Sequence, residues 1–231
     1  MAPTRGTLAW GVHALTASGA VIGVAALVAI GRGALEPAAV LLLLAFAIDS
    51  VDGALARAVG VGRVLPQIDG RRLDDMVDFL NYVVVPVVFM IAAGTLPHWG
   101  VAAVPVLASC YGFSRVDAKT EDDFFLGFPS YWNFVALYAW GLGVSAVTGT
   151  LVVIALSVMV FVPIKYAYPS KLRRLRTTTA MLGTAWCIAV AACFIAPERL
   201  AGFPLLEISL VYPIYYFAIS FWLGGLQRRE T

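Results

Sequence analysis

The sequence predicts an all-α fold, a polytopic membrane bundle of about eight transmembrane helices. Apolar residues make up 61% of the 231 residues and charged residues only 13%, whereas soluble globular domains average about 45–50% and about 25%. The mean hydropathy of the chain is +0.86, and its apolar residues form repeated runs long enough to cross a bilayer. This composition excludes an ordinary soluble domain, and we expect one membrane domain over residues 1–231.

The predicted spans are apolar runs separated by polar, glycine-containing or proline-containing breaks. In chain order they cover residues 7–30, 37–57, 71–93, 100–114, 128–147, 149–166, 177–196 and 204–225. Pro37 fits the first turn of the second span, where an amide hydrogen would have no helical partner. Pro86 is expected to kink the third span. Glycine and proline are expected to break helical periodicity in the linker 58–70.

The distribution of positive charge predicts the orientation of the bundle. With a cytoplasmic N-terminus, all 16 lysines and arginines except Arg32 and Arg199 fall on the cytoplasmic side. Cytoplasmic loops of membrane proteins carry such an excess of positive charge. We therefore expect both termini in the cytoplasm, on the same side as the acidic stretch that joins the second and third spans.

That acidic stretch carries two pairs of aspartates at helical spacing. Asp49 and Asp52 share one helix face, and so do Asp74 and Asp78, because residues three or four apart lie on the same side of a helix. A carboxylate at membrane depth costs about 2.5–3.5 kcal/mol on insertion scales, so such a group needs a counter-charge. Carboxylate oxygens without nearby His or Cys suit Mg²⁺ or Mn²⁺. The spacing thus predicts a divalent-metal site that opens to the cytoplasm.

Small residues accompany these aspartates. Gly53, Ala56 and Gly70 lie on the same stripes and leave room for a ligand against the backbone. Metal sites built from several carboxylates commonly serve phosphates, whose oxygens the metal bridges. Asp75 lies off the stripe and is interpreted as a solvated surface carboxylate. The stretch therefore favours a phosphate-bearing substrate.

The pattern Asp-x-x-Asp-Gly-x-x-Ala-Arg, followed by Gly-x-x-x-Asp-x-x-x-Asp, resembles the signature of the CDP-alcohol phosphotransferase family. The positions that match are Asp49, Asp52, Gly53, Ala56, Arg57, Gly70, Asp74 and Asp78. Twelve residues separate Arg57 from Gly70, more than in most members. This longer gap, with residues 12–19, 116–120 and 125–133, resembles the bacterial phosphatidylcholine synthases within the family.

The resemblance implies transfer of the phosphatidyl group of CDP-diacylglycerol to choline, with release of CMP and dependence on one or two Mn²⁺ or Mg²⁺ ions. It also implies a homodimer in the bacterial inner membrane with its active site facing the cytoplasm. No nucleic-acid partner is expected.

Roles for individual residues follow from combining the resemblance with the spacing. Asp49, Asp52, Asp74 and Asp78 are expected to hold the metal, and Asp78, furthest into the bundle, to act also as general base for the acceptor hydroxyl. The residues expected to bind nucleotide or phosphate are Gly53, Ala56, Arg57, Gly70, Arg115, His13 and Thr16. Of these, His13 and Thr16 rest on the resemblance, since many members carry Asn-x-x-Thr there; packing as a satisfied polar pair is the alternative.

Choline narrows the search for an acceptor site, because its quaternary ammonium has no hydrogen-bond donor on nitrogen. Aromatic faces and carboxylates suit such a cation. The candidates are Tyr82, one turn beyond Asp78, and four aromatic residues near the predicted cytoplasmic ends of the fourth to sixth spans: Tyr111, Tyr131, Trp132 and Tyr166. Packing inside the bundle or an interfacial aromatic belt is the alternative for each.

Two competing functions remain open from the sequence. The first keeps the chemistry and changes the acceptor, as in a phosphatidylserine or phosphatidylglycerophosphate synthase, which would need further cationic groups in the pocket. The second is a divalent-cation transporter, because acidic residues inside spans also mark ion pathways. A transporter predicts carboxylates distributed through several spans, whereas here they gather at one end of two.

Overall fold

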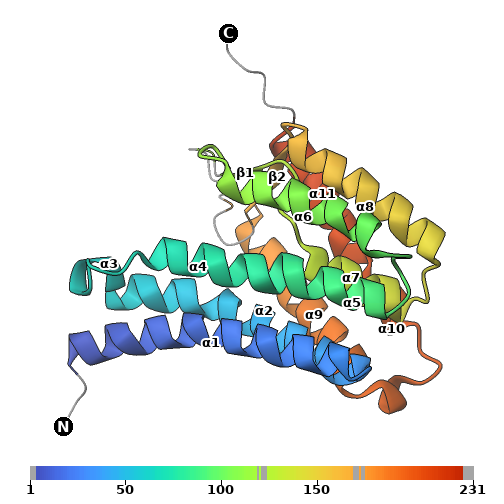
Figure 1. The fold of residues 1–231 in the computed structure, drawn as a ribbon. Helices are drawn as coiled ribbons and strands as arrows, with labels where there is room; N and C mark the ends of the chain where they lie inside the picture. Colours follow the sequence, from blue (N-terminus) through green and yellow to red (C-terminus); the bar gives the residue numbers. More distant parts are fainter. Residues whose placement is uncertain (1–3, 119, 121–123, 169–171, 173–174, 226–231) are drawn as a thin grey trace.

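The computed structural model describes residues 4–118, 120, 124–168, 172 and 175–225 (Figure 1). The elements run in the order α1 (Arg5–Gly31), α2 (Leu35–Val59), α3 (Val61–Val64), α4 (Gly70–Asp78), the π-helical η1 (Phe79–Val84), α5 (Val85–Ala92), α6 (Trp99–Ser114), β1 (Phe124–Leu126), α7 (Trp132–Gly141), α8 (Ala146–Phe161), β2 (Lys165–Ala167), α9 (Arg176–Ile195), the 3₁₀ turn η2 (Pro197–Leu200), α10 (Leu205–Ser209) and α11 (Val211–Leu223). The prediction of an all-helical membrane bundle is confirmed.

Several helices have the length and composition of membrane spans. Among the described residues, five qualify: Arg5–Gly31, Leu35–Val59, Gly70–Ala92, Arg176–Ile195 and Leu205–Leu223. Trp99–Ser114 and Ala146–Phe161 are shorter apolar helices. Large apolar side chains cover their outer surfaces; Trp222 is 71% exposed and Met181 is 69% exposed. Such surfaces are stable against lipid rather than water, and the chain is a polytopic membrane protein.

The helices form two groups around a shared core (Figure 1). α1 and α2 lie side by side, and the helix formed by α4, η1 and α5 packs against both. α6 and α8 form a second pair, and α7 packs against α5 between the two groups. Phe89 of α5, Leu42 of α2 and Trp132 of α7 are at most 2% exposed. The core therefore lies where α2, α5 and α7 meet.

The third predicted span, 71–93, agrees with the observed continuous helix over 70–92, which is irregular close to Pro86. A π-helical segment, η1, occupies Phe79–Val84 directly before Pro86. Proline lacks an amide hydrogen and its ring crowds the preceding turn, and a wider π turn accommodates both. The irregularity expected from Pro86 therefore coincides with a local change of helix type, and π-helical turns are themselves a common site of kinks.

The linker between the second and third spans breaks where glycine predicts, but it is not wholly irregular. α2 ends at Val59, and Gly60 has a left-handed backbone with φ +72°, which glycine adopts without strain. A single helical turn, α3, follows at Val61–Val64. A helix of four residues is too short to show a hydrophobic period in the sequence.

The fifth and sixth predicted spans have the wrong ends. The prediction ran over 128–147 and 149–166, whereas α7 covers Trp132–Gly141 and α8 covers Ala146–Phe161. The chain turns at Gly143, where φ is +62°, and Pro163 follows α8. Residues 165–167 form β2, which pairs antiparallel with β1. Strands of three residues carry too little alternation to be predicted.

The eighth predicted span, 204–225, is divided at Leu210 into α10 and α11. Six of the cations that were placed on the cytoplasmic side lie outside the described residues: Lys119, Lys171, Arg173, Arg174, Arg228 and Arg229.

Candidate active site

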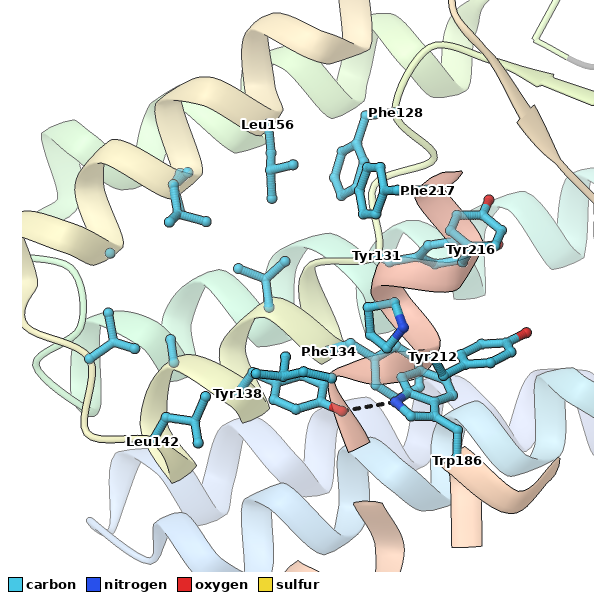
Figure 2. A pocket seen from close by; sticks show the side chains of 18 of the residues that line it. Phe128, Tyr131, Phe134, Tyr138, Leu142, Leu156, Trp186, Tyr212, Tyr216 and Phe217 are labelled. Carbon is cyan, nitrogen blue, oxygen red and sulfur yellow. Dashed lines mark hydrogen bonds between the residues drawn. The ribbon is translucent and has the colours of Figure 1, made fainter. Parts of the chain in front are cut away.

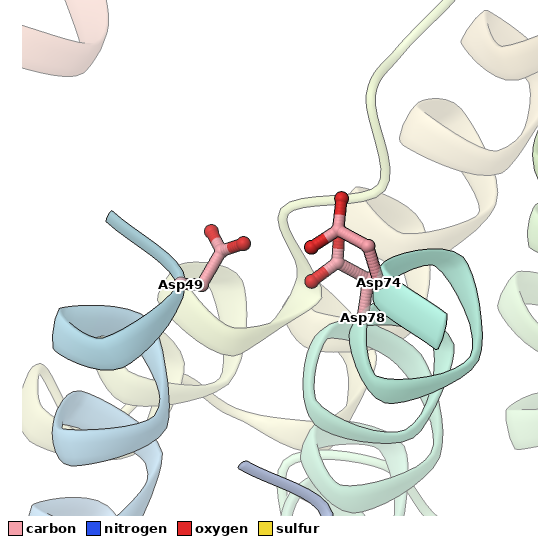
Figure 3. Close-up of side chains that lie close together, drawn as sticks. All are labelled: Asp49, Asp74 and Asp78. Atoms are coloured by element: carbon pink, nitrogen blue, oxygen red, sulfur yellow. The ribbon is translucent and has the colours of Figure 1, made fainter. Parts of the chain in front are cut away.

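Three of the four predicted aspartates converge between α2 and α4. One carboxylate oxygen from each of Asp49, Asp74 and Asp78 lies within 4.8 Å of the other two. Asp49 projects from α2, and Asp74 and Asp78 project toward it from successive turns of α4 (Figure 3). Three anionic groups at this separation repel one another unless a cation lies between them. All three donors are hard oxygens, so the cluster fits a divalent ion such as Mg²⁺ or Mn²⁺.

The local sequence starts α4 in the register that this cluster needs. Asp69 is the N-cap, and its Oδ1 accepts a hydrogen bond of 3.1 Å from the amide of Arg72. Acidic N-caps satisfy amides of the first turn, which have no helical partner. With the helix starting at Gly70, Asp74 and Asp78 fall one turn apart on one face.

Asp52 lies beside this cluster but outside the group of three. It follows Asp49 by one turn on α2 and is only 4% exposed. With Asp49, Asp74 and Asp78 it lines a small cavity that also contains Thr16. The structure therefore brings all four aspartates to one cavity and three of them into direct proximity.

Asp75, predicted to be a surface carboxylate, forms an i,i+4 ion pair of 4.0 Å with Arg71. The two side chains are 43% and 69% exposed, respectively. A pair this exposed contributes about 0–1 kcal/mol to stability.

The π-helical segment connects the cluster to α1 and α2. The hydroxyl of Tyr82 donates a hydrogen bond of 2.6 Å to Oδ2 of Asp49. The neighbouring Asn81 donates from Nδ2 to the carbonyl of Gly19 on α1 at 3.0 Å. A Cβ at Gly19 would lie 2.8 Å from Val77, so glycine is needed for the close approach of α1. Consecutive side chains of η1 thus reach two different helices and fix Asp49 relative to α4.

A larger polar cavity of about 220 Å³ opens onto the carboxylates. We call this the polar cavity; its walls include Asp49, Arg71, Asp74, Asp78, Tyr82, Arg115, Phe125, Phe128, Ser130, Tyr131 and Tyr168. Aspartates make up one part of its lining and aromatic side chains another, which we call its carboxylate and aromatic ends, and two arginines contribute to its walls. Such a combination suits a ligand that carries both phosphate and an organic cation.

Arg115 already has an anionic partner. Its Nε and Nη2 donate to the two carboxylate oxygens of Asp117 at 2.8 and 2.6 Å. This hydrogen bonding raises the pKa of Arg115 further above its ordinary value. To bind a phosphate, the guanidinium must use its remaining donors or exchange Asp117 for the ligand.

The other residues expected to bind nucleotide lie along the interface of α1 with α2 and α4. Thr16 lines the small cavity. His13 is 7% exposed, and a Cβ at Gly70 would lie 3.2 Å from its Cε1. Ala56 packs instead on a small apolar cluster that includes Ala9 of α1.

Two further residues predicted to bind nucleotide or phosphate, Gly53 and Arg57, lie one turn apart on α2. Arg57 is exposed on the last turns of this helix. A Cβ at Gly53 would lie 3.5 Å from its Nη1.

The structure separates the five aromatic candidates into two groups. Tyr82 and Tyr131 line the polar cavity, with ring centroids 6.2 Å apart. Trp132 is fully buried, and its indole Nε1 donates to Ser109 Oγ at 2.8 Å. Tyr166 is 1% exposed and stacks on Tyr216, while Tyr111 is 45% exposed and stacks on Phe161. These last three do not line the polar cavity.

Among the wall residues that sequence reasoning missed is a pair of aromatic side chains that pack on each other. Phe125 and Tyr168 line the polar cavity, and their ring centroids lie 4.6 Å apart. Phe125 belongs to β1 and Tyr168 follows β2, so the strand pairing brings them together. The sequence offered no signal for this pairing.

An apolar cavity of about 450 Å³ adjoins the polar one (Figure 2). It lies among α7, α8, α9 and α11, and Phe128 and Tyr131 belong to the walls of both cavities. Figure 2 shows Tyr131 beside Tyr216 of α11. The two residues of the 127–131 turn therefore separate a charged compartment from an apolar one.

Comparison with known proteins finds several close relatives, although no family model matches the chain. The phosphatidylcholine synthase of Legionella bozemanae is 38% identical over 214 residues, which cover 88% of this chain and 98% of the relative. That of Legionella pneumophila is 37% identical over 93% of this chain and 88% of the relative. That of Pseudomonas aeruginosa is 32% identical over 96% of this chain and 94% of the relative.

Proposed function

Because the chain belongs to the family of the bacterial phosphatidylcholine synthases, within the CDP-alcohol phosphotransferases, we propose that it transfers the phosphatidyl group of CDP-diacylglycerol to choline. The acceptor hydroxyl oxygen of choline forms a bond to the lipid phosphorus. The pyrophosphate bond breaks, CMP leaves, and the hydroxyl proton is taken up by a base. Two observations together carry this proposal. The relatives that match most of the chain are phosphatidylcholine synthases, and the carboxylate cluster opens into a cavity with aromatic walls.

The four aspartates have two tasks in this scheme. Asp49, Asp74 and Asp78, with Asp52 beside them, would hold one or two Mn²⁺ or Mg²⁺ ions. Bound there, the metal neutralises negative charge on the pyrophosphate oxygens. Asp78 would also accept the proton of the acceptor hydroxyl: like Asp49 and Asp74 it lines both the small and the polar cavity, and it is the aspartate furthest along α4 toward the bundle.

The cytidine nucleotide would lie against the faces of α1, α2 and α4 that meet at the cluster. Gly53 and Gly70 have no side chain to cover the backbone; Ala56, whose small side chain packs on the apolar cluster with Ala9, lets α1 approach α2, and Thr16 and His13 add polar groups nearby. Arg57 and Arg115 would bind phosphate oxygens through their guanidinium groups. For Arg115 this requires sharing the side chain with Asp117.

Choline must reach the same base, and this limits where its ammonium can be bound. Only two carbons separate the hydroxyl from the nitrogen, so the ammonium lies close to Asp78 during transfer. Of the five aromatic candidates, Tyr82 and Tyr131 share the polar cavity with Asp78. We therefore favour these two over Tyr111, Trp132 and Tyr166. Their π faces suit a quaternary ammonium.

We further propose that the bundle has eight spans and lies in the bacterial inner membrane. Both termini and the aspartate cluster would face the cytoplasm. The excess of positive charge on that side supports this orientation. A homodimer is an expectation from the family resemblance, to be checked by chemical cross-linking in membranes.

An acceptor panel tests the proposal. Purified protein in lipid nanodiscs receives CDP-diacylglycerol and labelled choline, serine, glycerol 3-phosphate or inositol. We expect label in lipid from choline alone, with one CMP released per lipid formed. Incorporation of serine and not choline would instead identify a phosphatidylserine synthase. Metal flux across vesicles without CMP release would support the transporter.

A further inference from the structure

The turn before α7 contains a buried residue in an unusual backbone conformation. Ser130 has φ +56° and is 2% exposed. Among described residues other than glycine, only Leu175 shares a positive φ. For a residue with a Cβ, such a conformation costs about 1–3 kcal/mol and persists only where its surroundings enforce it.

Buried hydrogen bonds hold this turn to the neighbouring helix. The hydroxyls of Ser130 and Ser109, on α6, lie 2.9 Å apart, and Ser109 Oγ also accepts from the indole of Trp132 at 2.8 Å. The amide of Trp132 donates to the carbonyl of Ser130 at 2.8 Å. All three side chains are at most 2% exposed. Fully satisfied buried networks make a local structure rigid.

The start of the turn is fixed equally firmly on its other side. The amide of Gly127 donates to the carbonyl of Ile164 at 2.9 Å, and that of Phe128 to the carbonyl of Met159 at 3.0 Å. Gly127 has φ +84°, and a Cβ there would overlap the carbonyl oxygen of Val160. The turn is therefore anchored to α6 and to the segment around the end of α8.

The residue that this anchored turn presents is Tyr131. Its ring centroid lies 6.2 Å from that of Tyr82, with the planes at 55°. Both rings line the polar cavity, and we call the part of that cavity beside them the recess; because the centroids lie so near each other, a cation there can lie within about 6 Å of both. Tyr82 is bound through its hydroxyl to Asp49, so the recess adjoins the carboxylate cluster.

From this arrangement we propose that the 127–131 turn sets selectivity for a trimethylated ammonium by fixing Tyr131 against Tyr82. Ser109, Ser130 and Trp132 are its positioning residues. This inference rests on the proposed use of choline. A quaternary ammonium offers no hydrogen bond by which a site could recognise it, so discrimination between three methyl groups and fewer depends on how closely the rings enclose it. The indole of Trp132 acts through the turn and not as a wall of the choline site.

Three variants test the proposal in nanodiscs with CDP-diacylglycerol and an equimolar mixture of choline and N,N-dimethylethanolamine. The ratio of the two lipid products is independent of how much of each preparation is active. Tyr131→Leu is expected to lower the ratio by at least about 2-fold; because N,N-dimethylethanolamine is also a cation at neutral pH, the fall stays below the about 30-fold that a whole cation–π contact is worth. Ser130→Gly and Trp132→Phe, which leave the Tyr131 ring intact, are expected to lower it measurably, by no more than Tyr131→Leu does. They should raise KM for choline without changing KM for CDP-diacylglycerol.

Ser130→Gly keeps the variant set informative, because glycine adopts a positive φ without strain and the turn can still form. If the Trp132→Phe protein does not accumulate in the membrane, the product ratio of Ser130→Gly tests the proposal by itself. Ser209→Ala is the matched control, since it removes a buried serine hydroxyl that hydrogen-bonds an aromatic side chain, Tyr138, outside the polar cavity. It should leave the product ratio unchanged.

The outcomes separate this inference from the proposed function. Wild-type protein that incorporates no choline overturns both. If the wild-type protein uses choline but Ser130→Gly keeps the wild-type product ratio and the wild-type KM for choline, the proposed function stands. The proposal that the 127–131 turn sets selectivity is then wrong. An equal shift in the Ser209→Ala control also contradicts it, because the effect would then be general to buried hydroxyls.

Discussion

The two ends of the polar cavity differ in how the chain builds them. At the carboxylate end, Asp74 and Asp78 are one turn apart on a single helix, so their relation is set by spacing alone. At the aromatic end, Tyr131 is placed by a strained turn, and Phe125 and Tyr168 are brought together by the pairing of two short strands. The chemistry common to the family thus lies on regular helices, whereas the wall that would select the acceptor lies on irregular backbone.

The largest effect is expected at the carboxylate end. Asp78→Asn removes the proposed base, and general-base catalysis contributes about 100- to 10,000-fold; kcat measured by CMP release should fall within that range. Much of the CDP-lipid binding should remain. Asp75→Asn is the comparison: Asp75 also lines the polar cavity but lies outside the group of three carboxylates, so kcat should fall far less. Wild-type turnover in Asp78→Asn would refute the assignment of the base.

Gly127→Ala probes the anchoring of the aromatic end. A left-handed backbone costs a residue with a Cβ about 1–2 kcal/mol, and overpacking against the carbonyl of Val160 adds about 1–3 kcal/mol. Gly202→Ala provides the comparison, since φ there is +83° but no atom lies within 4 Å of the added Cβ. Thermal unfolding in detergent should show a clearly larger loss for Gly127→Ala. Equal losses of thermal stability in the two variants would mean that the 127–131 turn shifts at little cost to accommodate the added Cβ.

Tyr82→Phe connects the two ends, because it removes the hydroxyl that holds Asp49 and keeps the ring. Loss of a group that orients a metal ligand typically lowers metal affinity by about 10- to 100-fold. Mn²⁺ binding, followed by electron paramagnetic resonance without substrate, should weaken accordingly. Tyr138→Phe, which removes a buried hydroxyl bound to Ser209, should bind Mn²⁺ like wild type. Unchanged affinity in Tyr82→Phe would show that Asp49 needs no such support.

The smallest effect is expected for the exposed pair of Arg71 and Asp75. Replacing Arg71 by Gln removes an ion pair 4.0 Å long between exposed side chains, and such pairs contribute about 0–1 kcal/mol. The melting temperature should therefore change little. A large loss would indicate that this pair supports the start of α4.

The sequence predicted the parts of this molecule that follow a helical period. It located the long helices to within a few residues and paired the aspartates correctly within α4. It failed where tertiary contacts override local pattern, at the ends of α7 and α8 and in the β1–β2 ladder. Trp132 illustrates the limit: its residue type suggested a choline wall, but the hydrogen bond to Ser109 that occupies its indole joins residues 23 positions apart. No local pattern reveals such a contact.

Metal dependence of choline transfer tests the central claim most directly. Wild-type protein, stripped with EDTA and supplied with CDP-diacylglycerol and choline, should form phosphatidylcholine and CMP in equal amounts only after Mn²⁺ or Mg²⁺ is restored, and Asp49→Asn and Asp74→Asn should each need far more metal. Transfer that continues at full rate in EDTA, or is unaffected in both variants, would contradict a metal-binding role for the carboxylates between α2 and α4.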